Sequence, residues 1–489
     1  MNLEMLLKKH RKFYPHPEPD LIRRAYEFAE VAHQGEKRLN GEDFIKHPLG
    51  VANLLAEIRL GSSSLAAGLL HDVLEHTDFE KEDLEEEFPS PISDLVEGVT
   101  VIKSVKTKTG EERQVENLRK LILASAEDVR VVLIRLAEKL HNLETIKALP
   151  EEKQKVVLSK VFEIYAPLAE RLGVYHFKWQ LEDLAFRYLN PEEFLEIRRG
   201  VGESRVQREA YMGRVRAKIE DELSARGIKF EIKGRAKHLY SIFNKLRRYE
   251  REGKVFGIEG ISRIYDQVAL MILVDSISEC YSVLSIVNSL WEPIPMEFDD
   301  YIAHPKPNGY RALHTTVLYE GRSLEIQIKT CQMHEIAEYG IAAHSYYKEK
   351  GNSRIVSEEK LTWLKDLIKW QEEIKNPREF EEALKLDVFG DRVFVLTPKG
   401  DVKDLPKGST PIDFAYAVHS ELGDSCVGAK VNGKVMSLDT KLENGQVVEI
   451  LTSRARKKPS SDWLSFARTT FARSKIRKAL RDFRENPKG

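Results

Sequence analysis

Apolar residues recur at three- and four-residue steps through most of the first 190 residues. Segments such as LIRRAYEFAEVAH, HPLGVANLLAEI, SLAAGLLHDVLEH and VRVVLIRLAEKLHNL show this spacing. A period near 3.6 residues is typical of helices that bury one face. We therefore predict an all-α domain over residues 1–195.

The pattern changes after residue 226. GIKFEIKG is typical of a strand, HLYSIFNKLRRYE of a helix, QVALMILV of a buried strand and CYSVLSIVNSLW of a helix. HTTVLYEGRSLEIQIKT predicts two strands joined through Glu320-Gly321. Strands interleaved with helices predict an α/β domain with a mixed sheet over residues 196–346.

The remaining chain divides into three parts. Residues 347–386 are charged and carry an apolar stripe that includes Trp363 and Trp370, which predicts a helical connector. Residues 387–453 alternate short strands with one helix, PIDFAYAVHSEL, and contain a hairpin around Asn432-Gly433, as in a small β-grasp-like domain. Residues 454–489 predict a basic helical region.

Charge is informative only locally. Lys and Arg number 77 and Asp and Glu 78, so the net charge does not indicate a partner. The basic segment after residue 453 is the exception, because it is suited to contacts with phosphate. Three widely separated cysteines and the lack of a long apolar run predict a cytoplasmic protein without a membrane segment.

Four residues of the helical domain form a candidate metal site. Imidazole and carboxylate ligands suit manganese, iron or zinc, and Glu75 lies one turn away as a candidate base for an attacking water. The candidate ligands are His47, His71, Asp72 and Glu138. The alternative is that these side chains are ordinary capped or paired groups on helices.

His47, the HDVLEH segment and LAEKLHN resemble the HD-type hydrolase domain of the RelA/SpoT family. The resemblance implies manganese-dependent removal of the 3′-pyrophosphate from a guanosine alarmone, with Arg38 and Asn142 contacting nucleotide. Two residues depart from the family pattern: His76 replaces an Asp after Glu75, and Glu138 replaces an Asp. We therefore expect hydrolysis to be weak or absent and the domain to have a regulatory or structural role.

In the α/β domain, GRAKHLYSIFNK places basic and hydroxyl side chains at and along the start of a helix, where an anion such as a triphosphate binds well. These residues are Arg235, Lys237, Ser241 and Lys245. The alternative is a solvated basic helix face.

Two carboxylates are candidates for one magnesium ion. Asp266 precedes the QVALMILV strand and Glu325 begins EIQIKT, and magnesium usually binds one or two protein carboxylates together with substrate phosphates. Between them, Tyr310 could stack on a purine. Phosphate or ribose contacts are expected from Lys306, Asn308 and His314.

Five motifs of this domain together resemble the alarmone synthetase domain of RelA/SpoT proteins, a nucleotidyltransferase-like fold. The motifs are GRAKHLYSI, YDQVAL, DDYIAHPKPNGYRALHTT, LEIQIKT and MHEIAEYGIAAH. The resemblance implies transfer of pyrophosphate from ATP to the 3′-hydroxyl of GDP or GTP. It assigns ATP binding to Arg235 and Lys237, guanine stacking to Tyr310, magnesium to Asp266 and Glu325, and substrate binding to Gln327 also. Glu325 is in addition the candidate base.

Three further features bear on activity. The acidic EFDD segment (297–300) is typical of family members specialised for synthesis. Met271 stands where the family usually has Arg, and Ser345 where it usually has Trp. We expect Met271 to affect the affinity for ATP rather than the class of reaction.

Residues 393–453 resemble a TGS domain. The resemblance implies that His419 contacts deacylated tRNA and that the basic segment contacts the ribosome, although His419 could instead pack against the sheet. Three hypotheses therefore remain: a synthetase with a weak HD domain, a bifunctional enzyme, and a sensor without catalysis.

Overall fold

The computed structural model describes residues 2–14, 17–101, 110–203, 205–236, 238–251, 253, 268–306, 309–342, 384, 392–453 and 458–485. The chain forms two compact units, one of Met1–Thr100 with Asp128–Lys360 and one of Val101–Glu127 with Leu361–Gly489. The predicted connector 347–386 lies outside the described residues, except for Leu384. No described helix has the length and apolarity needed to cross a bilayer.

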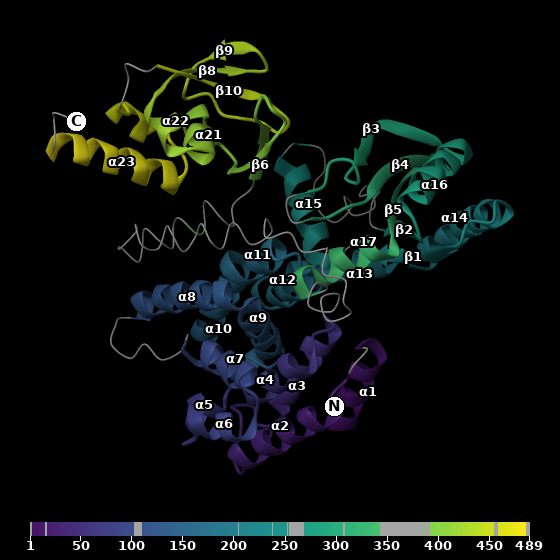
Figure 1. Ribbon diagram of the computed structural model, residues 1–489. Coiled ribbons are helices and arrows are strands. Elements are labelled where there is room, and N and C mark those ends of the chain that lie inside the picture. Colours follow the sequence, from purple (N-terminus) through teal and green to yellow (C-terminus); the bar gives the residue numbers. More distant parts are fainter. Residues whose placement is uncertain are drawn as a thin grey trace. The chain divides into compact units, whose positions relative to one another are not determined.

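The amino-terminal part of the first unit is helical, as the period of its apolar residues predicts (Figure 1). Its helices are α1 (Leu3–Phe13), α2 (Pro19–Ala32), α3 (Lys46–Glu57), α4 (Ser62–Leu70), α5 (Val73–His76), α6 (Lys81–Glu87), α7 (Ser90–Val101), α9 (Val129–Glu144), α10 (Glu151–Lys160), α11 (Ala166–Arg171), α12 (Tyr175–Leu189) and α13 (Pro191–Glu203). The helix α8 (Gly110–Glu127) belongs to the segment grouped with the second unit.

A five-stranded mixed sheet follows, in the order β1-β2-β5-β4-β3. Only β2 and β5 run parallel; the other neighbours are antiparallel. Its elements are α14 (Arg205–Ala225), β1 (Phe230–Ala236), α15 (Leu239–Arg251), β2 (Val268–Val274), α16 (Ile277–Leu290), β3 (Glu292–Asp300), β4 (Leu313–Tyr319), β5 (Arg322–Thr330) and α17 (Cys331–Tyr339). This arrangement confirms the predicted α/β domain with a mixed sheet.

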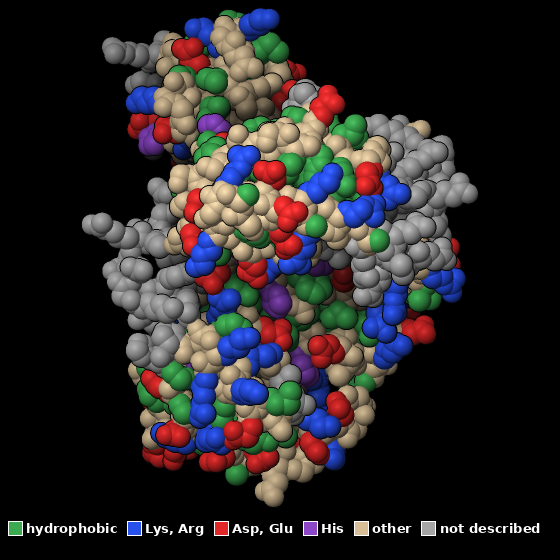
Figure 2. Space-filling view, turned by 90° about the vertical axis from the view of Figure 1, so that its right-hand side faces the viewer, with side chains coloured by type: hydrophobic (Ala, Val, Ile, Leu, Met, Phe, Trp, Pro, Cys, Tyr) green, Lys and Arg blue, Asp and Glu red, His purple; other side chains and the backbone are tan. Residues whose placement is uncertain are grey.

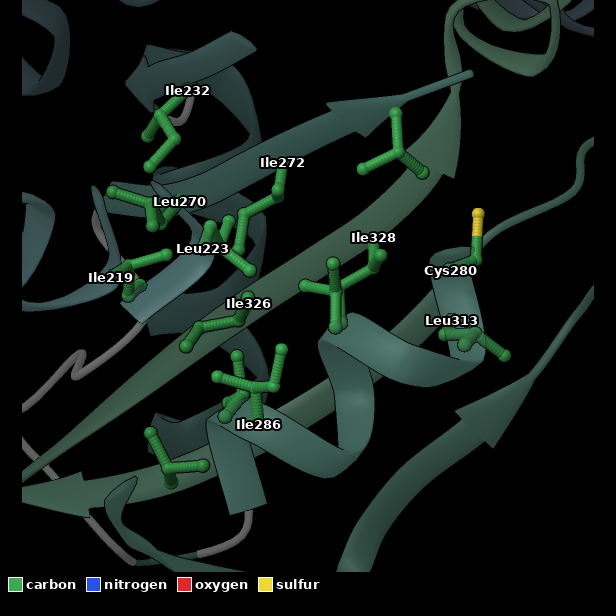
Figure 3. Close-up of a cluster of buried hydrophobic side chains, with 14 of the residues drawn as sticks. Ile219, Leu223, Ile232, Leu270, Ile272, Cys280, Ile286, Leu313, Ile326 and Ile328 are labelled. Carbon is green, nitrogen blue, oxygen red and sulfur yellow. The ribbon is translucent and has the colours of Figure 1, made fainter. Parts of the chain in front are cut away.

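One face of the sheet is buried by α14 and α16 (Figure 3). Ile219 and Leu223 of α14 and Ile286 of α16 pack on Ile326 and Ile328 of β5. The opposite face of β5 carries its polar residues, because successive side chains of a strand point to opposite faces. The core therefore fixes which face of the sheet can hold a site.

The turn between β4 and β5 has the predicted form. Glu320 and Gly321 both have positive φ angles, 49° and 72°, as a two-residue hairpin turn requires. β3 was not predicted, because Pro293 and Pro295 interrupt the alternation that marks a strand. β3 is an edge strand and its register shifts between Pro293 and Phe298, so it tolerates proline.

The second unit contains the predicted small β-rich domain. Its elements are β6 (Arg392–Leu396), β7 (Val402–Pro406), α21 (Pro411–Val418), α22 (Ser420–Asp424), β8 (Cys426–Val431), β9 (Lys434–Met436), β10 (Val448–Thr452) and α23 (Thr470–Glu485). Asn432 and Gly433 form the expected turn, with φ angles of 51° and 78°. A parallel bridge between Leu396 and Val447 joins the β6–β7 pair to the β10-β8-β9 sheet.

The helix α23 shares a core with this β-rich domain. Ile476 and Trp463 pack with Ile412 and Tyr416 of α21. Asp413, 1% exposed, accepts hydrogen bonds from the backbone N–H groups of Thr410 and Thr469 and so caps α21 and fixes the chain just before α23. On the face of the molecule shown in Figure 2, basic and acidic side chains are interspersed, so the described part of this face has no large patch of one charge.

Candidate functional site

Three of the four expected metal ligands lie together in the helical region. His47 is in the first turn of α3, His71 follows the last residue of α4, and Asp72 precedes α5. One ligand atom from each lies within 4.8 Å of the others, and all three side chains are buried. Adjacent residues at the junction of α4 and α5 thus reach the same point as a histidine from a separate helix.

Hydrogen bonding determines the tautomer of His71. Its Nδ1 lies 2.8 Å from the carbonyl oxygen of Gly68, which can only accept, so Nδ1 carries the proton. In the neutral ring this leaves the lone pair on Nε2, which lies 3.2 Å from Asp72 Oδ2 and has no hydrogen-bond partner in the part of the chain that the structure describes. An imidazole fixed in this way beside a carboxylate fits a divalent cation.

Burial keeps the neighbouring imidazoles neutral. It lowers the pKa of His47 well below the usual value. Burial, with Arg38, lowers the pKa of His141 to about 4. Because only neutral imidazole binds a metal, the cluster is suited to an ion at neutral pH.

The structure places Glu138 differently from the expected fourth ligand. Its carboxylate pairs with Arg135, which is 6% exposed, and lies 3.3 Å from Lys139 Nζ. Asn142 Nδ2 donates to Glu138 Oε1 at 3.2 Å, and Arg38 donates to Asn142 Oδ1 at 2.7 Å. Among the described residues, the compact cluster of ligand atoms does not include Glu138. A buried guanidinium needs a carboxylate, and Glu138 provides it.

Glu75 and His76 are exposed at the edge of the same cluster. Their ligand atoms and one of Asp72 lie within 4.8 Å of one another. The His76 ring also lies 5.4 Å from that of Phe44. His76 therefore occupies the position beside the candidate base that the sequence singled out.

The second group of candidate residues lines the sheet face opposite the core. Glu325, Gln327 and Lys329 alternate along β5, while the intervening residues are in the core. His314 of β4 pairs with Gln327. In the same register, Met271 of β2 lies on the other side of Gln327 and Asp299 of β3 beyond His314.

These side chains form a hydrogen-bonded network. His314 Nδ1 lies 3.3 Å from Glu325 Oε1, and His314 Nε2 lies 2.7 Å from the Tyr310 hydroxyl. Lys329 Nζ donates to the Tyr310 oxygen at 3.2 Å, and Gln327 Nε2 donates to Glu325 Oε1 at 2.9 Å. His314 thus lies between the Glu325 carboxylate, 3.3 Å away, and the Tyr310 hydroxyl, to which it is hydrogen-bonded. Carboxylate, imidazole and phenol therefore lie in a row along which a proton could move.

Sequence reasoning missed Lys329 and Tyr301. Lys329 is 2% exposed, and its Nζ lies 4.9 Å from the centre of the Tyr310 ring. Burial and a hydrogen bond with Asp299 raise the pKa of Tyr301 to about 12, and its ring lies 4.2 Å from Lys306 Nζ. The two-residue alternation along β5 was a usable signal for Lys329, whereas no local pattern distinguished Tyr301.

A cavity of about 220 Å³ opens on this network. β4 and β5 contribute His314, Gln327 and Lys329, and the connection before β4 contributes Lys306 and Tyr310. The helical region contributes Glu170, Gly173 and Tyr175, and α17 contributes Ile336, Ala337 and Glu338. The end of α17 lies against the turn before α12: Ile341 N–H donates to Leu172 O at 3.1 Å. A Cβ on Gly340 would lie 2.3 Å from the Gly173 carbonyl carbon, so the approach requires glycine.

The expected triphosphate site is only partly described. Ser241 and Lys245 lie on α15. Lys237, Asp266, Asn308 and the side chain of Arg235 lie outside the described residues. The first backbone N–H groups of α15, which we expected to face phosphate, instead meet a carboxylate: Tyr240 N–H donates to Asp183 Oδ1 at 2.9 Å.

In the second unit, His419 is a surface residue rather than part of the packing against the sheet. Its side chain is 67% exposed, and its Nδ1 accepts a hydrogen bond from Glu421 N–H at the start of α22. The nearby helix α23 carries basic residues along its length, including Arg473, Arg477 and Arg481.

Three family models match the chain. They are an HD domain over residues 25–175, the region found in RelA / SpoT proteins over residues 234–352, and a TGS domain over residues 393–452. The three matches correspond to the helical region, the mixed sheet and the small β-rich domain.

Similar proteins carry the same three regions over most of this chain. A GTP pyrophosphokinase of Myxococcus xanthus is 44% identical over 95% of the chain and 61% of its own length. A guanosine-3′,5′-bis(diphosphate) 3′-pyrophosphohydrolase of Aquifex aeolicus is 46% identical over 98% and 67%. A bifunctional (p)ppGpp synthase/hydrolase of Mycobacterium tuberculosis is 44% identical over 97% and 64%. The chain thus spans about three fifths of the length of several such relatives, and it belongs to the RelA/SpoT homologue family.

Proposed function

We propose that this chain transfers pyrophosphate from ATP to the 3′-hydroxyl of GDP or GTP. The observation that carries the proposal is the path Glu325–His314–Tyr310, with Lys329 beside it, at the cavity of the mixed sheet. Relatives named as GTP pyrophosphokinases support the same reaction. The reaction needs a base for the acceptor hydroxyl and cations for the phosphate groups. Glu325 is the candidate base, and Lys329 and Lys306 are the candidate cations.

The reaction forms one bond and breaks one. The acceptor 3′-oxygen bonds to the β-phosphorus of ATP, the bond from that phosphorus to the α–β bridging oxygen breaks, and AMP leaves. Glu325, directly or through His314, takes the hydroxyl proton. The Tyr310 ring offers a face for guanine, while Lys329 and Lys306 supply positive charge near it.

A divalent cation fits the donor set only in part within the described residues. Glu325 offers a carboxylate beside the cavity. We propose Asp266 as the second carboxylate. Bound there, magnesium would neutralise phosphate charge. Arg235, Lys237, Ser241 and Lys245 are proposed to bind ATP, and Asn308 and Gln327 to contact substrate.

The direct test incubates the purified chain with ATP, GDP and magnesium and separates the nucleotides by chromatography. We expect AMP and a guanosine product with two additional phosphates in equal amounts. Repeating the reaction with GTP compares the two acceptors. Absence of both products, with ribosomes and deacylated tRNA also present, would reject synthesis and leave the sensor hypothesis.

A second candidate function is hydrolysis of the alarmone at the helical site. The His47, His71 and Asp72 cluster supports it, since His71 Nε2 lacks a hydrogen bond and faces a carboxylate. A manganese ion held there would supply Lewis acidity, with Glu75 accepting a proton from water and Arg38 and Asn142 contacting nucleotide. A relative named as a pyrophosphohydrolase supports this assignment.

We propose that hydrolysis is slow, because His76 places an imidazole beside Glu75 and because Glu138 pairs with Arg135. Release of pyrophosphate from alarmone in the presence of manganese, measured beside synthesis, tests this. A hydrolysis rate comparable with synthesis would establish the bifunctional alternative.

The small β-rich domain is proposed to contact deacylated tRNA through His419 and the ribosome through the basic residues of α23, in the cytoplasm. The exposure of His419 supports this, because its ring is accessible. Binding of radiolabelled deacylated tRNA to the chain and to His419→Ala tests the contact.

A further inference from the structure

One stripe of α12 touches both sides of the proposed synthetase site. Tyr175, Trp179 and Asp183 occur at four-residue intervals, so they lie on one face of the helix. Tyr175 lines the cavity with Tyr310. Trp179 and Asp183 contact the start of α15, as described below. The HD-domain match ends at Tyr175, so this stripe begins where that match ends.

Trp179 stacks on His238, the residue immediately before α15. The ring centres are 4.3 Å apart and the rings are within 6° of parallel. The Tyr175 ring lies 6.1 Å from the same imidazole. His238 directly follows Lys237 in the GRAKH segment, and β1 ends at Ala236. The last residue of the segment proposed to bind ATP, His238, thus stacks on a residue of α12.

Asp183 completes the start of α15. Its Oδ1 accepts the N–H of Tyr240 at 2.9 Å and its Oδ2 the N–H of Leu239 at 3.4 Å. The first N–H groups of a helix have no partner within the helix, and a Ser, Thr, Asp or Asn just before it usually supplies one. GRAKH offers no such residue, so a carboxylate 57 residues earlier in the chain takes this role.

The two hydrogen bonds from backbone N–H groups also affect the pKa of the Asp183 carboxyl. Burial raises the pKa of its carboxyl, while the N–H groups of Tyr240 and Leu239 oppose that change. Both oxygens of the carboxylate therefore cap the first turn of α15. The same helix packs beside α15 through Phe186, whose ring lies 5.7 Å from that of Tyr240.

We propose that Trp179 and Asp183 of α12 are positioning residues for the ATP side of the proposed synthetase, and that Tyr175 of the same stripe positions the acceptor side. α12 contacts His238 and the first turn of α15, and its Tyr175, one turn before Trp179, lines the cavity. This inference rests on the proposed synthesis of the alarmone. It means that a working synthetase requires residues from before the matched RelA / SpoT region.

The test compares Asp183→Ala and Trp179→Leu with the wild-type chain in steady-state synthesis and in calorimetric binding of an ATP analogue with a methylene bridge between the α and β phosphorus atoms. Removing a helix cap or a stacked ring is expected to raise the KM for ATP and the Kd for the analogue about tenfold, while the KM for GDP changes less than about twofold. Asp183→Asn and Trp179→Phe should recover most of the loss, because they keep an oxygen acceptor and an aromatic face.

Ser276→Ala is the matched control. Ser276 caps α16 in the same domain through the N–H of Glu279 and touches neither α12 nor α15 in the contacts described. It should lower thermal stability without changing either KM. Tyr175→Leu should give the opposite pattern from Asp183→Ala, raising the KM for GDP more than that for ATP.

If Asp183→Ala raised the KM for ATP and the KM for GDP equally, or if Ser276→Ala raised the KM for ATP as much as Asp183→Ala, the stripe would contribute only to general stability. Either result would overturn the proposal. Tighter binding of the analogue by Asp183→Ala would also overturn it, since the carboxylate would then be blocking phosphate. If the wild-type chain binds the analogue yet makes no product, the proposed reaction fails while the binding comparison still decides the role of α12.

Discussion

The helical cluster and the sheet site combine the same two chemical groups, imidazole and carboxylate, in different surroundings. In the cluster, His71 Nδ1 is hydrogen-bonded to the Gly68 carbonyl and its Nε2 lies 3.2 Å from Asp72, beside a second imidazole, His47. In the sheet site, His314 Nε2 is hydrogen-bonded to the Tyr310 hydroxyl and its Nδ1 lies 3.3 Å from Glu325. The first set of donors suits a cation, and the second connects a carboxylate with a group that can give up a proton.

Burial follows the same division. His47, His71 and Asp72 are at most 4% exposed, whereas the side chains of His314 and Glu325 are 18% and 23% exposed. A buried neutral imidazole suits an ion that stays bound, and an accessible dyad beside a cavity suits a substrate that comes and goes. The comparison teaches that burial and the partner of the imidazole distinguish the proposed metal site from the proposed proton-transfer site.

The largest effect is expected from Glu325→Ala. Removing the carboxylate removes the proposed base and a proposed magnesium ligand, so synthesis should fall by about a thousandfold or more. Chromatographic assay of AMP formation measures this, with circular dichroism to confirm the fold. Manganese binding at the helical cluster should be unchanged. Near-normal turnover would mean that the base lies elsewhere.

His71→Ala should affect the proposed metal site of the helical cluster rather than the sheet site. Loss of a direct ligand should weaken manganese binding by more than about a hundredfold, measured by calorimetry, because even outer partners of ligands commonly contribute about 10- to 100-fold. Manganese should also raise the thermal midpoint of the wild-type chain but not of the variant. His419→Ala, an exposed histidine, is the control. Undiminished manganese affinity in His71→Ala would place the ion at another site.

Tyr310→Phe tests the network without removing the aromatic face. The phenolic oxygen contacts His314 and Lys329, so its loss should lower kcat about tenfold, while the KM for GDP changes little because the ring remains. Tyr319→Phe, on β4 among the core residues, is the matched control. A large rise in KM with kcat unchanged would show that the hydroxyl binds the acceptor rather than assisting transfer.

The smallest effect is expected from His76→Asp. A carboxylate beside Glu75 and Asp72 should raise manganese-dependent hydrolysis by several-fold, on the order of three to ten, through proton transfer and cation attraction. His76→Asn, which lacks the charge, should not. An unchanged rate in His76→Asp would leave the pairing of Glu138 with Arg135 as the limiting departure.

Several features of the site followed from the sequence because they are local. Adjacent residues 71 and 72 necessarily lie close together, and the alternation in EIQIKT places Glu325 and Gln327 on one face of a strand. The two hairpin turns depend on residues that adopt positive φ, which are recognisable from two positions. The roles assigned to Asp266, Lys237 and Asn308, and the boundaries of the predicted domains, remain predictions.

The sequence by itself determined most of the described helices and strands, with β3 as an exception, together with the two hairpin turns and most of the candidate polar residues, since periodicity and backbone preference act over a few positions. Tertiary structure alone decided that Glu138 pairs with Arg135, that Lys329 joins the network, and that Asp183 caps a helix 57 residues away. Each of these contacts supplies a hydrogen-bond or charge partner to a group that would otherwise be buried without one. Which groups are buried, and which partners are near them, is determined only when distant segments pack together.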